Sequence, residues 1–141
     1  MDILTKTHRS WNMSRIRCKD TKPEVFVRSI LHKAGYRFRK TVTKLPGKPD
    51  IVLPRYKLVI FIHGCFWHRH KNCKYAYMPK TRITFWEKKF ARNITRQIIV
   101  NKALRKSGWK IIEIWECQTK IQDFEKRIIS RVKRFTKKLA A

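Results

Sequence analysis

The sequence predicts an α/β fold of three layers, in which helices flank a mixed central sheet. Two observations support this prediction. Three segments carry apolar residues at helical spacing, and short segments rich in β-branched and aromatic residues lie between them. The predicted order is helix, three strands, helix, strand and helix, without an internal repeat. A chain of 141 residues, 43% of them hydrophobic, is long enough to bury one core, so a single domain is expected.

The first helix follows a polar and basic segment. Residues 1–20 are expected to form an N-terminal arm, and residues 21–141 a single domain that ends in a basic helix. Thr21 is suited to the N-cap of the first helix, and Glu24 lies three residues later, as in a capping box. Gly35 follows the last apolar residue of the periodic stretch and predicts the end of this helix.

Four strands are predicted from their apolar content. Residues 36–42 are the first, and residues 50–53 are the second, after a Pro/Gly turn at 46–49. Residues 57–62 form a nearly continuous apolar run, as expected of a central strand that is buried on both faces. Residues 109–116 form the last strand.

Two further helices complete the fold. The long one is predicted from Thr84, where Glu87 forms a second capping box, to about Lys106. Its apolar face is expected to contain Trp86, Phe90, Ile94, Ile98 and Leu104. The last helix carries its apolar residues between positions 121 and 135 and leads into a basic tail.

The charge of the chain is its most unusual total. Lys and Arg number 36 against 9 Asp and Glu, which gives a formal net charge of +27. The basic residues are spread along the whole sequence, which favours a domain that binds a nucleic acid over one that carries a basic targeting peptide. No long apolar run or signal peptide is present in the sequence, so a cytoplasmic, nucleoid-associated protein with reduced thiols and no membrane contact is expected.

A metal site is predicted in the segment that follows the central strand. Cys65, His70 and Cys73 have the spacing of metal ligands, and Cys117 ends the last predicted strand. Cys117 completes a four-ligand zinc site if its strand lies beside the strand that ends at Ile62. Four protein ligands leave no open position for water, so this zinc is expected to be structural. The alternative is buried free thiols with histidines at the surface.

A second group of residues has the chemistry of phosphodiester hydrolysis. Asp50 begins a strand and Glu24 lies in the first turn of a helix, where carboxylates can hold a magnesium ion. His63 and His68 are positioned to move protons. This layout resembles that of the restriction-endonuclease fold, whose last position is usually a lysine two residues after an acid. Here that position is His63, two residues after Phe61.

Each of these residues also has an interpretation without catalysis. Glu24 can serve only as the capping-box glutamate, and Asp50 only as a turn residue. His63 can support the zinc ligands, and His68 can be a surface residue. The large aromatic side chains around the Cys/His segment can form a small satellite core over it; they are Phe66, Trp67 and Trp86.

Several motifs together resemble the very short patch repair (Vsr) endonucleases. The central one is HGCFWH at 63–68 followed by His70 and Cys73, and PGKPD at 46–50 matches the acidic motif of the family. Further matches lie in the arm, in the long helix and around WEC at 115–117, so that the similarity covers roughly residues 8–117. The resemblance implies a monomeric, magnesium-dependent endonuclease of restriction-endonuclease-like fold.

The resemblance also implies a substrate and a set of catalytic roles. The substrate is double-stranded DNA with a T:G mismatch, which arises when 5-methylcytosine deaminates, and one strand is nicked 5′ to the T. Asp50 binds Mg²⁺ together with the backbone carbonyl of Ile62, and Glu24 acts through water. His68 transfers the proton with support from His63. MutL-type repair proteins are possible partners of such an enzyme.

Zinc and DNA contacts follow from the same resemblance. The implied Zn²⁺ ligands are Cys65, His70, Cys73 and Cys117. The implied DNA-binding residues are Phe66, Trp67 and Trp86 as wedges from the major groove, Met13 of the clamping arm from the other side, and Lys89, Asn93 and Arg96 of the long helix. A T:G pair is weaker than a matched pair, so inserted side chains can use that difference for selectivity.

The chain departs from the family pattern at three points. Two residues separate His70 from Cys73 where one is expected, Gln97 replaces a frequent acid, and the charge of +27 is high. Two other functions therefore compete with mismatch nicking. One is a less selective DNA nuclease of the same fold in a defence or mobile element. The other is a non-catalytic, zinc-stabilised protein that binds nucleic acid.

Overall fold

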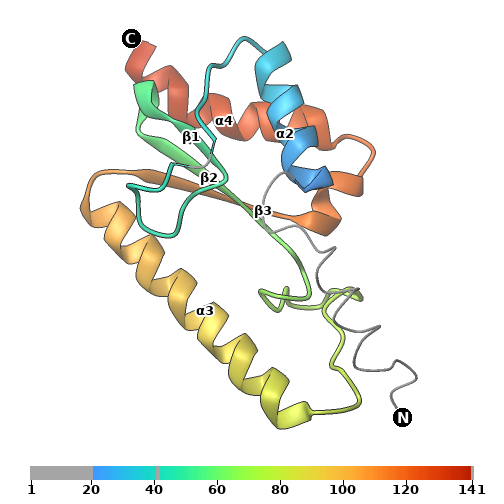
Figure 1. Cartoon of the computed structure of the whole chain (residues 1–141). Coiled ribbons are helices and arrows are strands. Elements are labelled where there is room, and N and C mark those ends of the chain that lie inside the picture. The colour runs from blue at the N-terminus through green and yellow to red at the C-terminus, as the bar shows by residue number, and fades with distance from the viewer. Residues whose placement is uncertain (1–20, 41, 141) are drawn as a thin grey trace.

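A computed structural model describes the backbone of residues 21–40 and 42–140 and the side chains of these residues up to 136, and the predicted arm with Met13 lies outside them. The elements are α2 (Lys22–Lys33), β1 (Ile51–Leu53), the 3-10 turn η1 (Pro54–Tyr56), β2 (Leu58–His63), α3 (Ile83–Lys106), β3 (Lys110–Trp115), the 3-10 turn η2 (Glu116–Lys120) and α4 (Phe124–Ala140). Figure 1 shows a sheet with helices on both sides, so the predicted mixed sheet flanked by helices is confirmed.

The sheet has the order β1-β2-β3, with β2 in the centre. β1 runs antiparallel to β2, and Ile51 lies opposite Ile60. β3 runs parallel to β2, and the two strands end together, with His63 opposite Trp115. Parallel neighbours need a long crossover between them, and the loop and helix between positions 64 and 109 supply it. The parallel pair therefore brings the segments that follow β2 and β3, which are distant in sequence, to the same end of the sheet.

Alternation along β2 separates two cores. Leu58 and Ile60 point to the face covered by α2 and α4, whereas Val59 and Phe61 point to the face covered by α3. The first core is the larger; its buried members include Val27, Leu31, Ile112, Ile114, Ile128 and Val132. The α3 side contributes only Val100 and Leu104 to the second core. Because both faces of β2 are covered, its sequence is apolar almost throughout.

The strand predicted at 36–42 is wrong among the residues that the structure describes. Arg39 and Val52 form an isolated bridge, with two backbone hydrogen bonds of 2.8 Å between them. The physical reason is the shortness of β1, which has three residues and is closed by Pro54, a residue without an N–H donor. β1 therefore offers few backbone groups with which a fourth strand could pair.

Both predicted capping boxes are also wrong. Thr21 occupies the N-cap position of α2, but its side chain makes no capping hydrogen bond, and Glu24 pairs with Arg28 instead. α3 begins one residue before Thr84, and its N-cap is Arg82, in a left-handed conformation. The backbone carbonyl of Arg82 accepts the first helical hydrogen bond, so Thr84 lies inside the first turn.

The predicted apolar face of α3 is correct only in part. Phe90 and Leu104 are buried, but Ile94 is 39% exposed and Ile98 is 63% exposed. The buried side of α3 is rotated from the predicted one: it runs through Phe90, Val100 and Leu104, with Asn93 and Gln97 half-buried between them, and Ile94 and Ile98 lie beside it. Among the described helices, none is long and apolar enough to cross a membrane.

Candidate active site and metal centre

A cleft of about 1020 Å³ opens where β2 ends and α3 diverges from the sheet. The start of α2 and the loop before β1 form one wall, and the N-terminal half of α3 forms the other. The predicted site residues that line it are Glu24, Asp50, Ile62, His63, Trp67, His68, Lys89, Asn93 and Arg96. The fold therefore gathers residues predicted for catalysis and for DNA binding around one cavity.

Asp50 extends the antiparallel ladder through its side chain. The backbone N–H of Ile62 donates to Oδ2 of Asp50 at 2.7 Å, just beyond the last paired residues of β1 and β2. Burial raises the pKa of Asp50 to about 7; the hydrogen bond from Ile62 lowers this pKa, and the adjacent charge of Glu24 raises it. Burial makes the charged form of this carboxylate unfavourable, so a bound cation would stabilise the site as a proton does.

The turn before Asp50 is fixed by its glycine. Gly47 has a φ of +73°, a conformation that L side chains rarely adopt. A Cβ at this position would lie 2.4 Å from Cγ1 of Val100 on α3, which is inside van der Waals contact. The turn is thus seated directly on the long helix, and this close approach sets the position from which Asp50 enters the cleft.

Glu24 is the second carboxylate at this wall. It is buried, and its Oε2 accepts from the Arg28 guanidinium at 2.8 Å. Its charge acts on Asp50, which places the two carboxyl groups close together. Glu24 thus forms an ion pair with Arg28 in place of the predicted capping box, and its role in catalysis stays a prediction. Two carboxyl groups with little access to water are suited to a hard divalent cation.

His63 and His68 form a pair at the floor of the cleft. Their ring centroids are 4.3 Å apart, and the His63 ring also contacts Trp115 at 5.1 Å. Burial lowers the pKa of His63 to about 3, with His68 as the second cause. Burial also lowers the pKa of His68, partly opposed by the charge of Glu113. Burial therefore favours the neutral form of both imidazoles, and Nε2 of His63 lies 3.6 Å from a carboxylate oxygen of Glu113.

The four predicted zinc ligands meet at one point. The ligand atoms of Cys65, His70, Cys73 and Cys117 all lie within 4.8 Å of one another. Nδ1 of His70 is 3.7 Å from Sγ of Cys65 and 3.3 Å from Sγ of Cys117. Ideal tetrahedral zinc places such atoms about 3.6 Å apart. The donor set and its spacing therefore fit a tetrahedral metal, and the parallel pairing of β2 with β3 is what delivers Cys117.

The loop has two left-handed positions around His70. Arg69 and Asn72 have φ values of +54° and +56°, on either side of His70. Asparagine tolerates this conformation better than most residues. The His70 amide donates to the Cys65 carbonyl at 3.1 Å, and its ring stacks on Trp115 with centroids 4.3 Å apart. Two residues between His70 and Cys73 therefore do not prevent the four ligands from meeting.

Aromatic side chains join the Cys/His loop to α3. The Phe66 ring packs against buried Phe90 and against Trp86, with centroids 5.1 and 5.5 Å apart. Trp67 borders the cleft, and Lys89 Nζ lies 5.0 Å from the centre of its ring. Phe66 thus packs among aromatic rings, while Trp67 also presents a surface to the cavity.

Arg69 organises this loop and was missed in the sequence. Its guanidinium donates to the carbonyls of Phe66, Ala76 and Tyr77 at 3.3, 2.8 and 3.0 Å, and it lies 4.2 Å from the centre of the Phe90 ring. In a chain so rich in basic residues, nothing in the sequence distinguishes Arg69 from the others. Its role depends on carbonyls that only the folded loop brings together.

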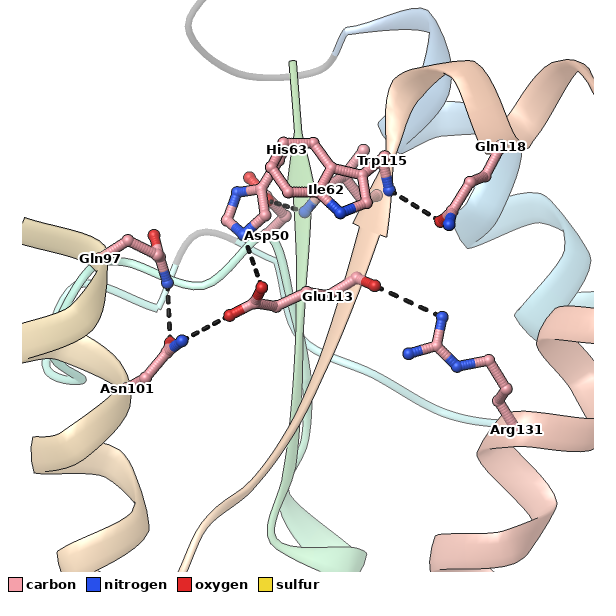
Figure 2. Close-up of polar contacts among 9 residues, drawn as sticks. All are labelled: Asp50, Ile62, His63, Gln97, Asn101, Glu113, Trp115, Gln118 and Arg131. Carbon is pink, nitrogen blue, oxygen red and sulfur yellow. Dashed lines mark hydrogen bonds and ion pairs between the residues drawn. The ribbon is translucent and has the colours of Figure 1, made fainter. Parts of the chain in front are cut away.

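Glu113 was also missed, although the sequence held a signal for it. It is a charged residue in the middle of an apolar strand, between Ile112 and Ile114. Figure 2 shows its side chain directed to the α3 side of the sheet, between Asn101 and His63. An acid at such a position in a sheet indicates either a partner on the facing layer or a functional site.

The fold and the site together define a class of protein. Carboxylates for a divalent cation, imidazoles for proton transfer and a basic flank for a phosphate backbone are the groups used by metal-dependent nucleases. The Cys/His cluster beside them adds a group of four side chains that could hold a metal ion.

Comparison with known proteins identifies the family. The family model for the DNA mismatch endonuclease Vsr matches residues 1–75. The chain is 47% identical over 119 residues to the type II nicking enzyme V.NmeAIP of Neisseria meningitidis serogroup A, with 84% of each chain covered. It is 40% identical over 116 residues to the DNA mismatch endonuclease Vsr of Escherichia coli K12, with 82% of this chain and 74% of that one covered.

The chain therefore belongs to the DNA mismatch endonuclease Vsr family. A third relative, the type II nicking enzyme V.XorIIP of Xanthomonas oryzae pv. oryzae, is 44% identical over 117 residues and covers 83% of this chain and 85% of its own. Family membership and these relatives support DNA endonuclease activity, with DNA as the partner of the chain.

Proposed function

We propose that the protein is a magnesium-dependent endonuclease that nicks one strand of DNA 5′ to the T of a T:G mismatch. The observation that carries the proposal is the cleft itself, in which Asp50 and Glu24 face His63 and His68. Its geometry matches the needs of phosphodiester hydrolysis, which are charge neutralisation, an activated water and a proton for the leaving oxygen. A single-domain nuclease of restriction-endonuclease-like fold is part of this proposal.

Asp50, the carbonyl of Ile62 and, through water, Glu24 would hold the catalytic ion. Bound Mg²⁺ supplies charge neutralisation at the scissile phosphate and acidifies a bound water. The raised pKa of Asp50 supports this assignment, because the neighbouring groups do not offset the cost of burying its charge in the metal-free site. His68 then transfers the proton to or from the reacting oxygens, and His63 supports it from the buried side.

The Cys/His cluster is proposed to hold Zn²⁺ as a structural ion. All four positions would be filled by protein atoms, so the cluster stabilises the loop that carries His68 and follows His63, and it has no role in the reaction itself. Mismatch recognition is assigned to the neighbouring flank. Its proposed members are Phe66, Trp67 and Trp86 as wedges, Lys89, Asn93 and Arg96 as polar contacts, and Met13 from the arm.

A nicking assay with magnesium tests the proposal. Duplexes that differ only in a single T:G or T:A pair are incubated with the protein at several salt concentrations. We expect one nick, 5′ to the mismatched T, and no cut in the matched duplex. Cutting of both duplexes would instead indicate the less selective nuclease. Tight binding to both without any cut would indicate a protein that binds nucleic acid without cutting it. A chain with a charge of +27 can bind DNA tightly whatever its sequence, so binding alone does not support an endonuclease.

Trp67→Ala is expected to reduce mismatch preference more than overall affinity. Stacking of an aromatic ring on a base contributes about 1–3 kcal/mol, and this contribution is realised only where the pair is easily opened. The measurement is the ratio of dissociation constants for T:A and T:G duplexes at elevated salt. Tyr75→Ala is the matched control, because Tyr75 is an exposed aromatic of the same loop that does not line the cleft. Equal losses on both duplexes would contradict the wedge role of Trp67.

A further inference from the structure

A chain of polar side chains leads from α3 to His63. Nε2 of Gln97 donates to Oδ1 of Asn101 at 2.8 Å, and Nδ2 of Asn101 donates to Oε1 of Glu113. The other carboxylate oxygen of Glu113 lies 3.6 Å from Nε2 of His63. Figure 2 shows these side chains in sequence, from the helix across the sheet face to the imidazole.

Glu113 is held at both its backbone and its side chain. The guanidinium of Arg131, on α4, donates to the backbone carbonyl of Glu113 at 3.3 Å from the opposite face of the sheet. Asn101 anchors the carboxylate from α3, and Gln97 anchors Asn101 one helical turn away. A side chain held in this way presents a fixed acceptor to its neighbour, because its rotamers are restricted before any ligand binds.

His63 has an unmet hydrogen-bonding need at the atom that faces this acceptor. Its Nε2 is buried and, among the described residues, makes no hydrogen bond. Burying a polar atom without a partner is unfavourable. An ordinary hydrogen bond is about 2.9–3.0 Å long, so a side-chain movement of roughly 0.6 Å would connect Nε2 to the Glu113 carboxylate at 3.6 Å. An ionised carboxylate only accepts hydrogen bonds, so Nε2 must carry the hydrogen in this pair.

We propose that Glu113 is a positioning residue for His63: its carboxylate, aligned by Asn101, accepts the Nε2 hydrogen and so fixes the tautomer and the orientation of the imidazole. This tautomer leaves the lone pair on Nδ1, which makes that nitrogen the acceptor of the ring. The inference rests on the proposed function in one respect, which is that His63 supports proton transfer by His68. The same arrangement of an acid behind a histidine orients the imidazole in other catalytic sites.

Glu113→Gln is the substitution that separates charge from shape. The amide is nearly isosteric with the carboxylate, so its carbonyl can still accept from Asn101. Its NH₂ group then faces Nε2 of His63 and needs a lone pair there, which moves the hydrogen to Nδ1. We expect the nicking rate under single-turnover conditions to fall about 10- to 100-fold, as for other residues that orient a functional histidine. The dissociation constant for the duplex should be unchanged.

Three controls make the expected result specific. Glu125→Gln removes the same charge at an exposed position on α4 and should leave the rate as it is. In a His63→Ala background, Glu113→Gln should have no further effect on the residual rate, because its partner is gone. The nitrogen shifts of the His63 ring, measured by NMR on the zinc-loaded full chain, should show the hydrogen on Nε2 in the parent and on Nδ1 in Glu113→Gln.

Two results would overturn the role of Glu113. One is an unchanged His63 tautomer in Glu113→Gln, and the other is an equal loss of rate with and without the imidazole at position 63. A parent protein that does not nick DNA at all would refute the proposed function instead. The tautomer measurement would still decide the role of Glu113 in that case, because it does not depend on activity.

Discussion

Asp50→Asn is expected to abolish nicking and to leave DNA affinity equal or higher. The substitution keeps an acceptor for the Ile62 amide but removes the charge that would hold the catalytic ion. Loss of metal-derived stabilisation of the transition state is worth about 4 kcal/mol, or roughly a thousandfold in rate. Affinity should not fall, because the carboxylate and the DNA phosphates repel each other. The matched control is Asp123→Asn, which removes the same charge at an exposed ion pair with Arg127.

The same variant has a signature in stability that does not depend on activity. Burial raises the pKa of Asp50 from its ordinary value of 3.8 to about 7, so the folded metal-free protein keeps a proton that the unfolded chain has lost. Its stability therefore falls as the pH rises from about 4 to about 7 and levels off above that range. Asp50→Asn lacks this loss, so its advantage in melting temperature, in chelator, should grow between pH 5 and pH 8. An advantage that does not change with pH, or nicking at the parental rate, would contradict the assignment.

Cys117→Ser should lower both the zinc content and the stability of the fold. In the proposed zinc site, Cys117 is the member that ties the end of β3 to the loop that follows β2, so its loss would open the fourth position. Structural zinc contributes its binding free energy to folding, and we expect a loss of several kcal/mol. The measurements are metal content per chain and thermal unfolding with and without chelator.

The control for this substitution is Cys18→Ser, which makes the same chemical change at the one cysteine of the sequence that is not among the predicted zinc ligands. It should keep the parental zinc content. Nicking by Cys117→Ser should fall as well, because His68 lies on the loop that the proposed metal fixes and packs against His63 at the end of β2. Unchanged zinc content in Cys117→Ser would remove this residue from the site.

The sequence predicted the elements whose signals are local and strong. The apolar run of β2, the strand before Cys117 and the periodic face of α2 were all found in place, and so was the parallel neighbour that brings Cys117 to the loop. The strand at 36–42 failed because its existence depends on the length of its partner. Ile94 and Ile98 were assigned to the core because the prediction followed the apolar residues of α3, whereas its packed side also includes the half-buried polar residues Asn93 and Gln97.

The candidate site was predicted where the residue types are rare. Cysteine, histidine and the few carboxylates stand out in a chain of 36 basic residues, so Asp50, Glu24 and the Cys/His group could be singled out. Arg69 and Asn101 could not, because arginine and asparagine are unremarkable at those positions. Their importance arises from partners on other elements, such as the Ala76 carbonyl and the Glu113 carboxylate, and tertiary structure alone makes these pairs.

The split of the metal ligands along the chain has a consequence for biosynthesis. Cys65, His70 and Cys73 leave the ribosome together, directly after the β1-β2 hairpin, whereas Cys117 follows only after the whole of α3 and β3. In the proposed zinc site, an ion held by the first three ligands can nucleate the loop on the nascent chain before the sheet is complete. The slow step is then the docking of β3, a non-local parallel pairing whose closing contact is the fourth ligand. Refolding in excess zinc should therefore be faster than refolding of the metal-free chain.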